Sequence, residues 1–286
     1  MLLKTFIAVA LLTSVFHHAG SSDLSSVYIA STPGDDPIKM ILSIPAESKV
    51  DFMRWNLVLS SSGEFSLKLS YGESKPNTLG FKEANERHYE GKYFVSKNHL
   101  DIYHLKGKGI NGELMLARIN ENLFHILTSD QQLMVGNGGW SYTLNAEKPV
   151  QGSSVLRSFR ASENDTARQM VFDGRTPCRE FAVDHGLDAN PSCFKVKWRL
   201  ILNRDSGTLE PTTYSTRRIV YDLADNTGKW AIKKTGSDAV IIELNPDEPG
   251  RSISLIMLDN NILYFLDKNG QPYTGNADFS FALNRN

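Results

Sequence analysis

The sequence contains little cysteine and no long hydrophobic run. Only two cysteines, Cys178 and Cys193, occur among 286 residues. The longest apolar run, from Thr5 to Phe16, is about 12 residues long, whereas a helix that spans a bilayer needs roughly 20. We therefore expect no membrane span. Since no cysteine follows the N-terminal run, we expect no lipid anchor either.

An excess of charge of one sign is also missing. The chain has 31 Lys and Arg against 32 Asp and Glu, which gives a formal net charge of −1. Neither a basic block nor an acidic tail occurs. Proteins that bind nucleic acids use a basic surface to neutralise phosphates. The composition therefore argues against a nucleic-acid partner.

Known catalytic signatures do not occur in the chain. A Gly-x-Ser-x-Gly elbow, a Gly-rich phosphate loop and a His-Glu-x-x-His helix are all missing. The histidines after the N-terminal run form no pair with the i, i+2 or i, i+4 spacing of metal sites. We expect a protein that is not an enzyme and has no cofactor.

The N-terminus has the layout of a secretory signal peptide. The chain opens MLLKTFIAVALLTSVFHHAGSSD, in which Lys4 precedes the apolar run and small residues follow it. We assign residues 1–22 to this signal and expect a soluble, exported protein that is periplasmic or secreted. In such an oxidising compartment two cysteines favour a disulfide, here between Cys178 and Cys193.

Other roles for the two cysteines stay open at this point. Cys178, His185 and Cys193, with Asp184 as a further ligand, could hold Cu(I) or zinc if the thiols remain reduced. A redox or nucleophilic role would require a nearby base or helix N-terminus to lower the thiol pKa.

The chain contains a tandem repeat. Asn122 begins NLFHILTSDQQLMVGNGGWSYTLN, and Asn261 begins NILYFLDKNGQPYTGNADFSFALN, which aligns with it without a gap at an offset of 139. Upstream, RWNLVL matches KWRLIL and EGKYFV matches TGKWAI. At the start of each copy the similarity is weak, and the alignment sets Ala46 opposite Cys178. The cysteine segment then looks like an insertion specific to the second copy. We expect one domain over residues 23–149 and another over residues 150–286.

Each copy has the pattern of an antiparallel β-protein. In FSLKLSY, the side chains of Phe65, Leu67, Leu69 and Tyr71 share one face, because successive strand residues point to opposite sides. Turn residues recur at short intervals, and no long helical stripe is present. About eight strands per copy predict two small closed barrels, since closure removes exposed edges. A β-sandwich is the alternative.

Tryptophans mark the expected barrel interiors. Trp55 and Trp198 occupy matching positions in the two copies, and Trp230 matches Tyr93. If the barrels are filled, these rings form the core. If a barrel is open, Trp55, Trp198 and Trp230 are candidates to line a ligand pocket.

The motifs of the second copy resemble a known family. VFDGRTPC, KWRLIL, GKW, AVIIEL and LYFLDKNG are similar to the N-terminal domain of NlpE-type copper-resistance lipoproteins. The resemblance implies a lipocalin-like barrel and a link to envelope stress or copper handling. This chain has neither the Cys-x-x-Cys pair nor the lipid-attachment cysteine of that family.

The resemblance and the composition together suggest a non-enzymatic envelope protein. We expect a binding or sensing module for a protein partner or a small hydrophobic ligand. Copper is the one cofactor that the resemblance suggests. The alternative is a lipocalin-like carrier of a small hydrophobic ligand.

Overall fold

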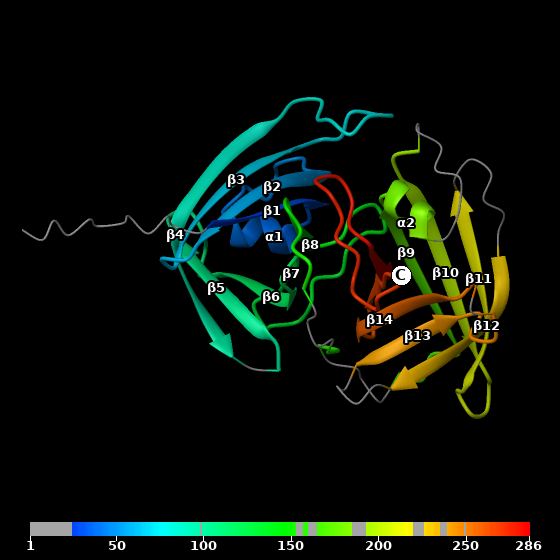
Figure 1. The fold of residues 1–286 in the computed structure, drawn as a ribbon. Coiled ribbons are helices and arrows are strands. Elements are labelled where there is room, and N and C mark those ends of the chain that lie inside the picture. Colours follow the sequence, from blue (N-terminus) through cyan, green and yellow to red (C-terminus); the bar gives the residue numbers. More distant parts are fainter. Residues whose placement is uncertain are drawn as a thin grey trace, which may run out of the picture.

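The computed structural model describes most of the chain that follows the expected signal peptide. The described residues are 25–97, 99–152, 157–159, 165–184, 193–219, 226–234, 239–248 and 250–286. The signal-peptide prediction for residues 1–22 lies outside them. Strands dominate the described chain and form two closed barrels side by side, which confirms the expected all-β class (Figure 1).

The first barrel is a meander in which each strand pairs with the next and the last returns to the first. Its strands are β1 (Ser25–Pro33), β2 (Phe52–Ser60), β3 (Glu64–Gly72), β4 (Asn85–Lys97), β5 (Asp101–Gly107), β6 (Leu114–Asn120), β7 (Leu123–Ile126) and β8 (Thr143–Ala146). The ring closes where Tyr28 of β1 pairs with Ala146 of β8. Closure leaves no unpaired sheet edge.

The second barrel repeats this topology. Its strands are β9 (Gln169–Thr176), β10 (Val196–Arg204), β11 (Pro211–Ile219), β12 (Asn226–Lys234), β13 (Val240–Leu244), β14 (Ile253–Asp259), β15 (Ile262–Phe265) and β16 (Ala282–Arg285). It closes where Asn284 of β16 pairs with Asp173 of β9. The two barrels fall within the expected ranges 23–149 and 150–286.

Alternating apolar residues build both interiors. Phe65, Leu67, Leu69 and Tyr71 of β3, which the sequence placed on one face, all lie in the core of the first barrel. Each fully buried Leu or Phe contributes roughly 1.5–3 kcal/mol relative to leaving it exposed. The alternation along each strand therefore decides which face turns inward.

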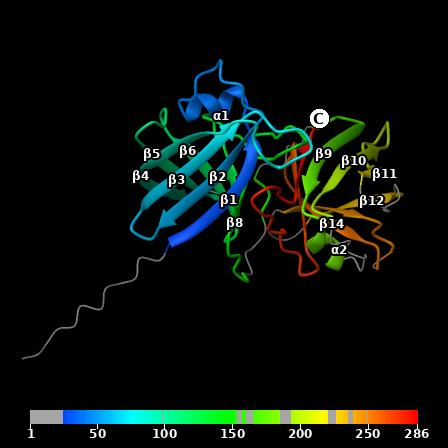
Figure 2. The same cartoon turned by 90° about the horizontal axis from the view of Figure 1, so that it is seen from above.

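A short helix covers one end of each barrel. Helix α1 (Asp36–Ile41) follows β1, and α2 (Arg179–Asp184) follows β9. Six residues are too few for a helix that is stable alone, so tertiary contacts must hold each helix in place. Ile38 of α1 and Phe181 of α2 supply such contacts, since each is buried in the core of its barrel. Figure 2 shows the two helices on opposite sides of the molecule.

The structure corrects the alignment at the start of the two copies. The Trp55 indole donates to Thr32 at 2.8 Å, and the Trp198 indole donates to Thr176 at 2.9 Å. Two residues beyond these threonines stand Gly34 and Cys178, so Gly34, not Ala46, is the counterpart of Cys178. The connections 34–51 and 177–195 are nearly equal in length. The cysteine segment is therefore no insertion, because both copies carry a helical cap at this point.

The two barrels share an apolar interface. Outward-facing side chains of β5–β7 in the first barrel and of β13–β16 in the second form one buried cluster. Its members are Leu100, Ile102, Met115, Ala117, Ile119, Leu123, Leu127, Leu133, Ala239, Ile241, Ile256, Leu258, Ile262, Tyr264, Leu266 and Ala282. The barrels thus use both faces of these strands, one toward their own interior and one toward each other.

Polar contacts show that the interface has an approximate two-fold axis. The Asn145 side-chain oxygen accepts from the Gly275 amide at 2.8 Å, and the Asn284 side-chain oxygen accepts from the Gly136 amide at 2.7 Å. Ser141 meets its own counterpart, Ser280, with 2.5 Å between hydroxyl oxygens. Reciprocal contacts of this kind define the isologous interface of a symmetric dimer, here within one chain.

Candidate functional site

The three tryptophans proposed as pocket-lining groups lie in the barrel cores. Trp55, Trp198 and Trp230 are each no more than 4% exposed. Their indole nitrogens donate to Thr32, Thr176 and the Asn203 carbonyl, respectively. A buried indole with a satisfied N–H is a packed core group. The candidate ligand site therefore lies elsewhere, where a barrel interior opens to solvent.

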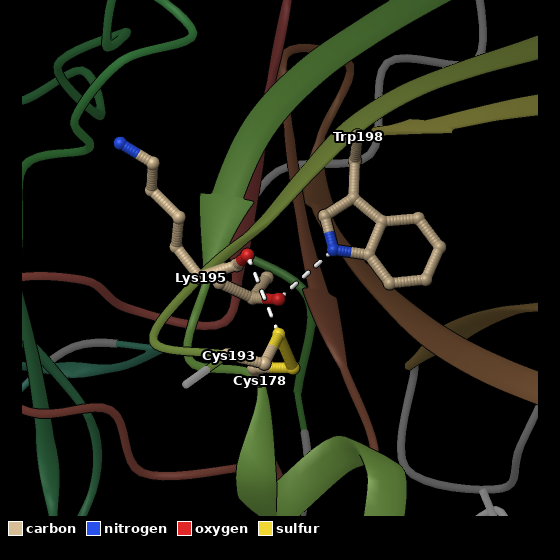
Figure 3. Close-up of a disulfide and its surroundings, with 5 residues drawn as sticks. Cys178, Cys193, Lys195 and Trp198 are labelled. Atoms are coloured by element: carbon tan, nitrogen blue, oxygen red, sulfur yellow. Dashed lines mark hydrogen bonds between the residues drawn. A yellow bond between two sulfur atoms is a disulfide. The ribbon is translucent and has the colours of Figure 1, made fainter. Parts of the chain in front are cut away.

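The cysteine pair forms the expected disulfide. Cys178 and Cys193 are bonded, with their Cα atoms 5.8 Å apart, and the bond joins the base of α2 to the segment leading into β10 (Figure 3). The Sγ atom of Cys193 lies 3.8 Å from the Lys195 carbonyl oxygen. While the bond is intact, neither sulfur can act as a thiolate ligand or nucleophile. His185, the third member of the proposed metal set, lies outside the described residues.

The end of the first barrel opposite α1 holds an open pocket, here called the mouth. Its volume is about 650 Å³. The start of β1, the turn after β2 and parts of β4 to β8 surround it. Ligand sites in proteins commonly have volumes of about 300–1,000 Å³, so the mouth is large enough for one small molecule.

Aromatic rings form a continuous wall in the mouth. The ring centroids of Tyr28 and Phe124 are 4.7 Å apart, those of Phe124 and Tyr103 are 4.8 Å apart, and those of Tyr103 and Tyr93 are 5.5 Å apart. Tyr28 and Phe124 are buried, whereas Tyr93 and Tyr103 are half-exposed. The wall thus runs from the barrel interior to the opening and offers apolar ring surface to a ligand.

The polar groups of the mouth sit at its rim. The Tyr28 hydroxyl donates to the Glu121 carbonyl at 3.0 Å, and the Tyr93 hydroxyl donates to the Ser60 carbonyl at 2.7 Å. The Arg118 guanidinium lies 3.5 Å from the Glu121 carboxylate. Burial raises the pKa of Tyr28 to about 12, so this phenol is neutral at physiological pH. The mouth therefore combines an apolar wall with hydroxyl groups and the Arg118–Glu121 ion pair, and Glu147 and Lys148 add one further charge of each sign.

The second barrel is filled at the equivalent place. Tyr93 of β4 lies opposite Leu105 of β5 in the first sheet, and Trp230 of β12 lies opposite Leu244 of β13 in the second. These cross-strand pairs show which residues of the two barrels occupy equivalent positions. Tyr103 then corresponds to Ile242, and Arg118 corresponds to Met257. Trp230, Ile242 and Met257 are all buried. Larger or less polar side chains therefore close the second barrel where the first is open.

Sequence reasoning missed the residues of the mouth. It singled out tryptophans, whereas Tyr28, Tyr103, Arg118 and Phe124 form the open end. One signal was available in the repeat at an offset of 139, where Arg118 stands opposite Met257 and Tyr103 opposite Ile242. A polar residue in one copy opposite an apolar residue in the other marks a position where the copies differ in burial.

The fold and the mouth define a double β-barrel in which the first interior opens at one end. The described residues at the equivalent positions of the second barrel are buried. No protein-family model, curated protein or solved structure matches the chain. Among the residues that the structure describes, no helix is long and apolar enough to cross a membrane.

Proposed function

We propose that this protein is an exported, non-enzymatic binding protein whose first barrel takes up a small, largely apolar ligand at its mouth. The observation that carries the proposal is the open pocket of about 650 Å³ with its wall of four aromatic rings. Neutral hydroxyls and carbonyls at the rim would orient the ligand, while the rings would bury its apolar surface. The disulfide supports export, since such bonds persist in oxidising compartments.

A second candidate function comes from the resemblance to NlpE-type proteins. It would make the protein an envelope module that senses stress or handles copper through a protein partner. The disulfide bears on the copper part, because Cu(I) binds thiolates and both sulfurs are oxidised here. Intact-mass measurement and thiol counting on the exported protein, combined with a Cu(I) titration, test this candidate. Two free thiols with stoichiometric copper uptake would favour it over the carrier.

Filling the mouth tests the carrier proposal. Tyr93→Trp copies Trp230 of the second barrel, and the new indole N–H can still donate to the Ser60 carbonyl, as Trp230 donates to Asn203. We expect wild-type protein to bind the neutral fluorescent probe phenylnaphthylamine saturably. We expect Tyr93→Trp to bind it about tenfold more weakly or worse, since the larger indole takes up space that the probe needs and forcing the probe against it would cost about 1–3 kcal/mol.

The neighbouring residue provides a matched control. Phe94 is 51% exposed and points away from the barrel interior, so Phe94→Trp adds an indole one position along β4 without filling the mouth. Its probe affinity should equal that of the wild type. Equal affinities for Tyr93→Trp and wild type would rule out the mouth as the binding site, as would an equal loss in both variants.

A further inference from the structure

A second cavity lies between the barrels, away from the mouth. This inter-barrel cleft has a volume of about 1200 Å³. The first barrel contributes the end of β1, the start of β2, and loop 74–79. The second barrel contributes Arg175 of β9 and segment 194–197. Loops 136–140 and 275–279, which meet near the two-fold axis, complete the lining.

One wall of the cleft is a stack of aromatic rings that ends on a guanidinium group. Phe81 stacks on Phe52 at 4.2 Å between centroids, and Phe52 stacks on Trp140 at 4.9 Å. The Arg175 guanidinium carbon lies 5.5 Å from the Trp140 ring centroid. A guanidinium held by its face on a ring still presents its N–H groups at the edge, where they can bind an anion. The stack thus fixes Arg175 in place across the barrel junction.

The second barrel's side of the cleft gathers positive charge. Lys195 and Lys197 line the cleft beside Arg175, and among the described residues none of these three side chains forms an ion pair. Burial lowers the pKa of Lys195, and the neighbouring charges of Arg175 and Lys197 lower it further. Burial also lowers the pKa of Arg175. Arg175 and Lys195 are therefore partly desolvated, and Lys195 is repelled by Arg175 and by the exposed Lys197. A bound anion would relieve both costs.

The two-fold axis explains where the uncompensated charge comes from. Arg54 of the first barrel pairs with Asp278 at 2.6 Å. Trp55 corresponds to Trp198, so Arg54 corresponds to Lys197, and the offset of 139 makes Gly139 the counterpart of Asp278. One half of the junction therefore has a carboxylate partner for its cation. The other half has glycine at that place and leaves Lys197 without one.

We propose that the inter-barrel cleft is a binding site for an organic anion with a flat apolar part. Its carboxylate, sulfonate or phosphate group binds Arg175, Lys195 and Lys197. Its apolar part lies against Phe194, which is 55% exposed in the cleft and has the Lys195 ammonium 4.9 Å from its ring centroid. The site is separate from the mouth, whose charged rim pair is balanced.

Two related probes separate the cleft from the mouth. Anilinonaphthalene sulfonate carries an anionic group on the same aromatic frame as the neutral probe phenylnaphthylamine. We expect the sulfonate to bind in the cleft, with an affinity that falls as salt is raised, because exposed charges are screened. Phenylnaphthylamine should bind in the mouth with little dependence on salt.

Restoring the missing carboxylate gives the sharpest test. A Cβ atom on Gly139 would lie 3.1 Å from Asn137 Oδ1 and 3.7 Å from the Arg175 guanidinium. Gly139→Asp therefore requires the Asn137 side chain to shift by a few tenths of an ångström, and it places a carboxylate beside Arg175. We expect it to weaken sulfonate binding about tenfold, since the new carboxylate would compete with the sulfonate for the charge-assisted hydrogen bonds of Arg175. Lys197→Gln, at an exposed side chain, should weaken the same binding severalfold.

The controls keep the result unambiguous. Lys92→Gln removes an exposed positive charge on β4, outside the cleft, and should leave sulfonate binding unchanged. Phenylnaphthylamine binding at the mouth should be equal in all three variants and reports that each is folded. The proposal is overturned if Gly139→Asp and Lys197→Gln bind the sulfonate as tightly as wild type, or if Lys92→Gln weakens it equally. Loss of sulfonate binding in Tyr93→Trp alone would place that probe in the mouth instead.

Discussion

His125 is a fully buried histidine at the interface of the two barrels. Its Nε2 lies 2.8 Å from the Met134 carbonyl oxygen, which can only accept, so Nε2 carries the proton. Its Nδ1 then accepts from the Tyr264 hydroxyl at 2.8 Å, and Thr143 donates to that hydroxyl at 2.6 Å. The hydrogen bonds therefore fix one neutral tautomer. A second proton on His125 would make Nδ1 a donor that faces the hydroxyl proton of Tyr264.

The free energy of unfolding should consequently depend on pH through His125. Burial lowers the pKa of His125 from 6.5 to about 4. Between these values the unfolded chain binds the proton and the folded chain does not, so falling pH favours unfolding. The contribution lost between pH 6.5 and pH 4 is on the order of 3 kcal/mol. Urea unfolding at a series of pH values measures it.

Substitution isolates this contribution from that of the carboxylates. His125→Gln cannot titrate in this range, so its free energy of unfolding should fall less steeply between pH 6.5 and pH 4 than that of wild type. His88→Gln serves for comparison as the same replacement away from the interface, where the side chain is 55% exposed and lies 2.9 Å from the Glu90 carboxylate. Equal slopes in His125→Gln and wild type would contradict a neutral, buried His125.

The two capping helices are held in place by different means. Around α1, the Tyr89 hydroxyl donates to the Leu42 carbonyl and the Lys39 ammonium donates to the Ala46 carbonyl, each at 2.8 Å. Around α2, the Cys178–Cys193 disulfide joins the helix base to the approach to β10. Phe181 of α2 also packs on Trp198 at 5.1 Å between ring centroids. The Tyr273 hydroxyl also donates to Asp184 of α2 at 2.7 Å. Hydrogen bonds therefore hold both caps, and the second has a covalent bond in addition.

Removing the disulfide should loosen α2 and lower the stability of the protein. A closed loop of about 16 residues contributes about 3 kcal/mol in the chain-entropy model. The double variant Cys178→Ser, Cys193→Ser should lose about that much in urea unfolding. Amide exchange should speed up in α2 and stay unchanged in α1. Reduced wild type should match the variant. An unchanged free energy of unfolding would show that the non-covalent contacts of α2 secure the cap without the disulfide.

Strand-level features of this fold are accessible from sequence because they depend on local alternation. Phe65, Leu67 and Leu69 turn inward as their period of two predicts. The sequence alignment sets Ala46 opposite Cys178 because the capping helices share little sequence. The Trp–Thr hydrogen bonds and the strand registers reveal Gly34 as the counterpart. The mouth and the inter-barrel cleft depend on barrel closure and docking. No local pattern brings Trp140 next to Arg175, which lies in the other barrel.

At the scale of the whole molecule, we expect the interface to couple the two barrels into one cooperative unit. The apolar cluster between them contains residues from four strands of the second barrel and three of the first, so separating the barrels would expose all of it to water. Reciprocal hydrogen bonds through Asn145 and Asn284 fix how the barrels are oriented toward each other, because each side-chain oxygen accepts from a glycine amide of the other barrel. Neither barrel can therefore leave its partner without a large loss of buried apolar surface.

A buried charge at this interface should uncouple the barrels. Ala117 is fully buried in the shared cluster, and Ala117→Glu would place an unpaired carboxylate there, at a cost of several kcal/mol. Wild type should unfold in one transition, with amides of β2 and β10 losing protection together. In Ala117→Glu we expect two transitions, or a lower midpoint with separate exchange rates for the two barrels. Lys92→Glu, on an exposed position of β4, should keep the single transition. A single, unshifted transition in Ala117→Glu would mean that each barrel is stable without the interface, and that the inter-barrel cleft is open to rearrangement.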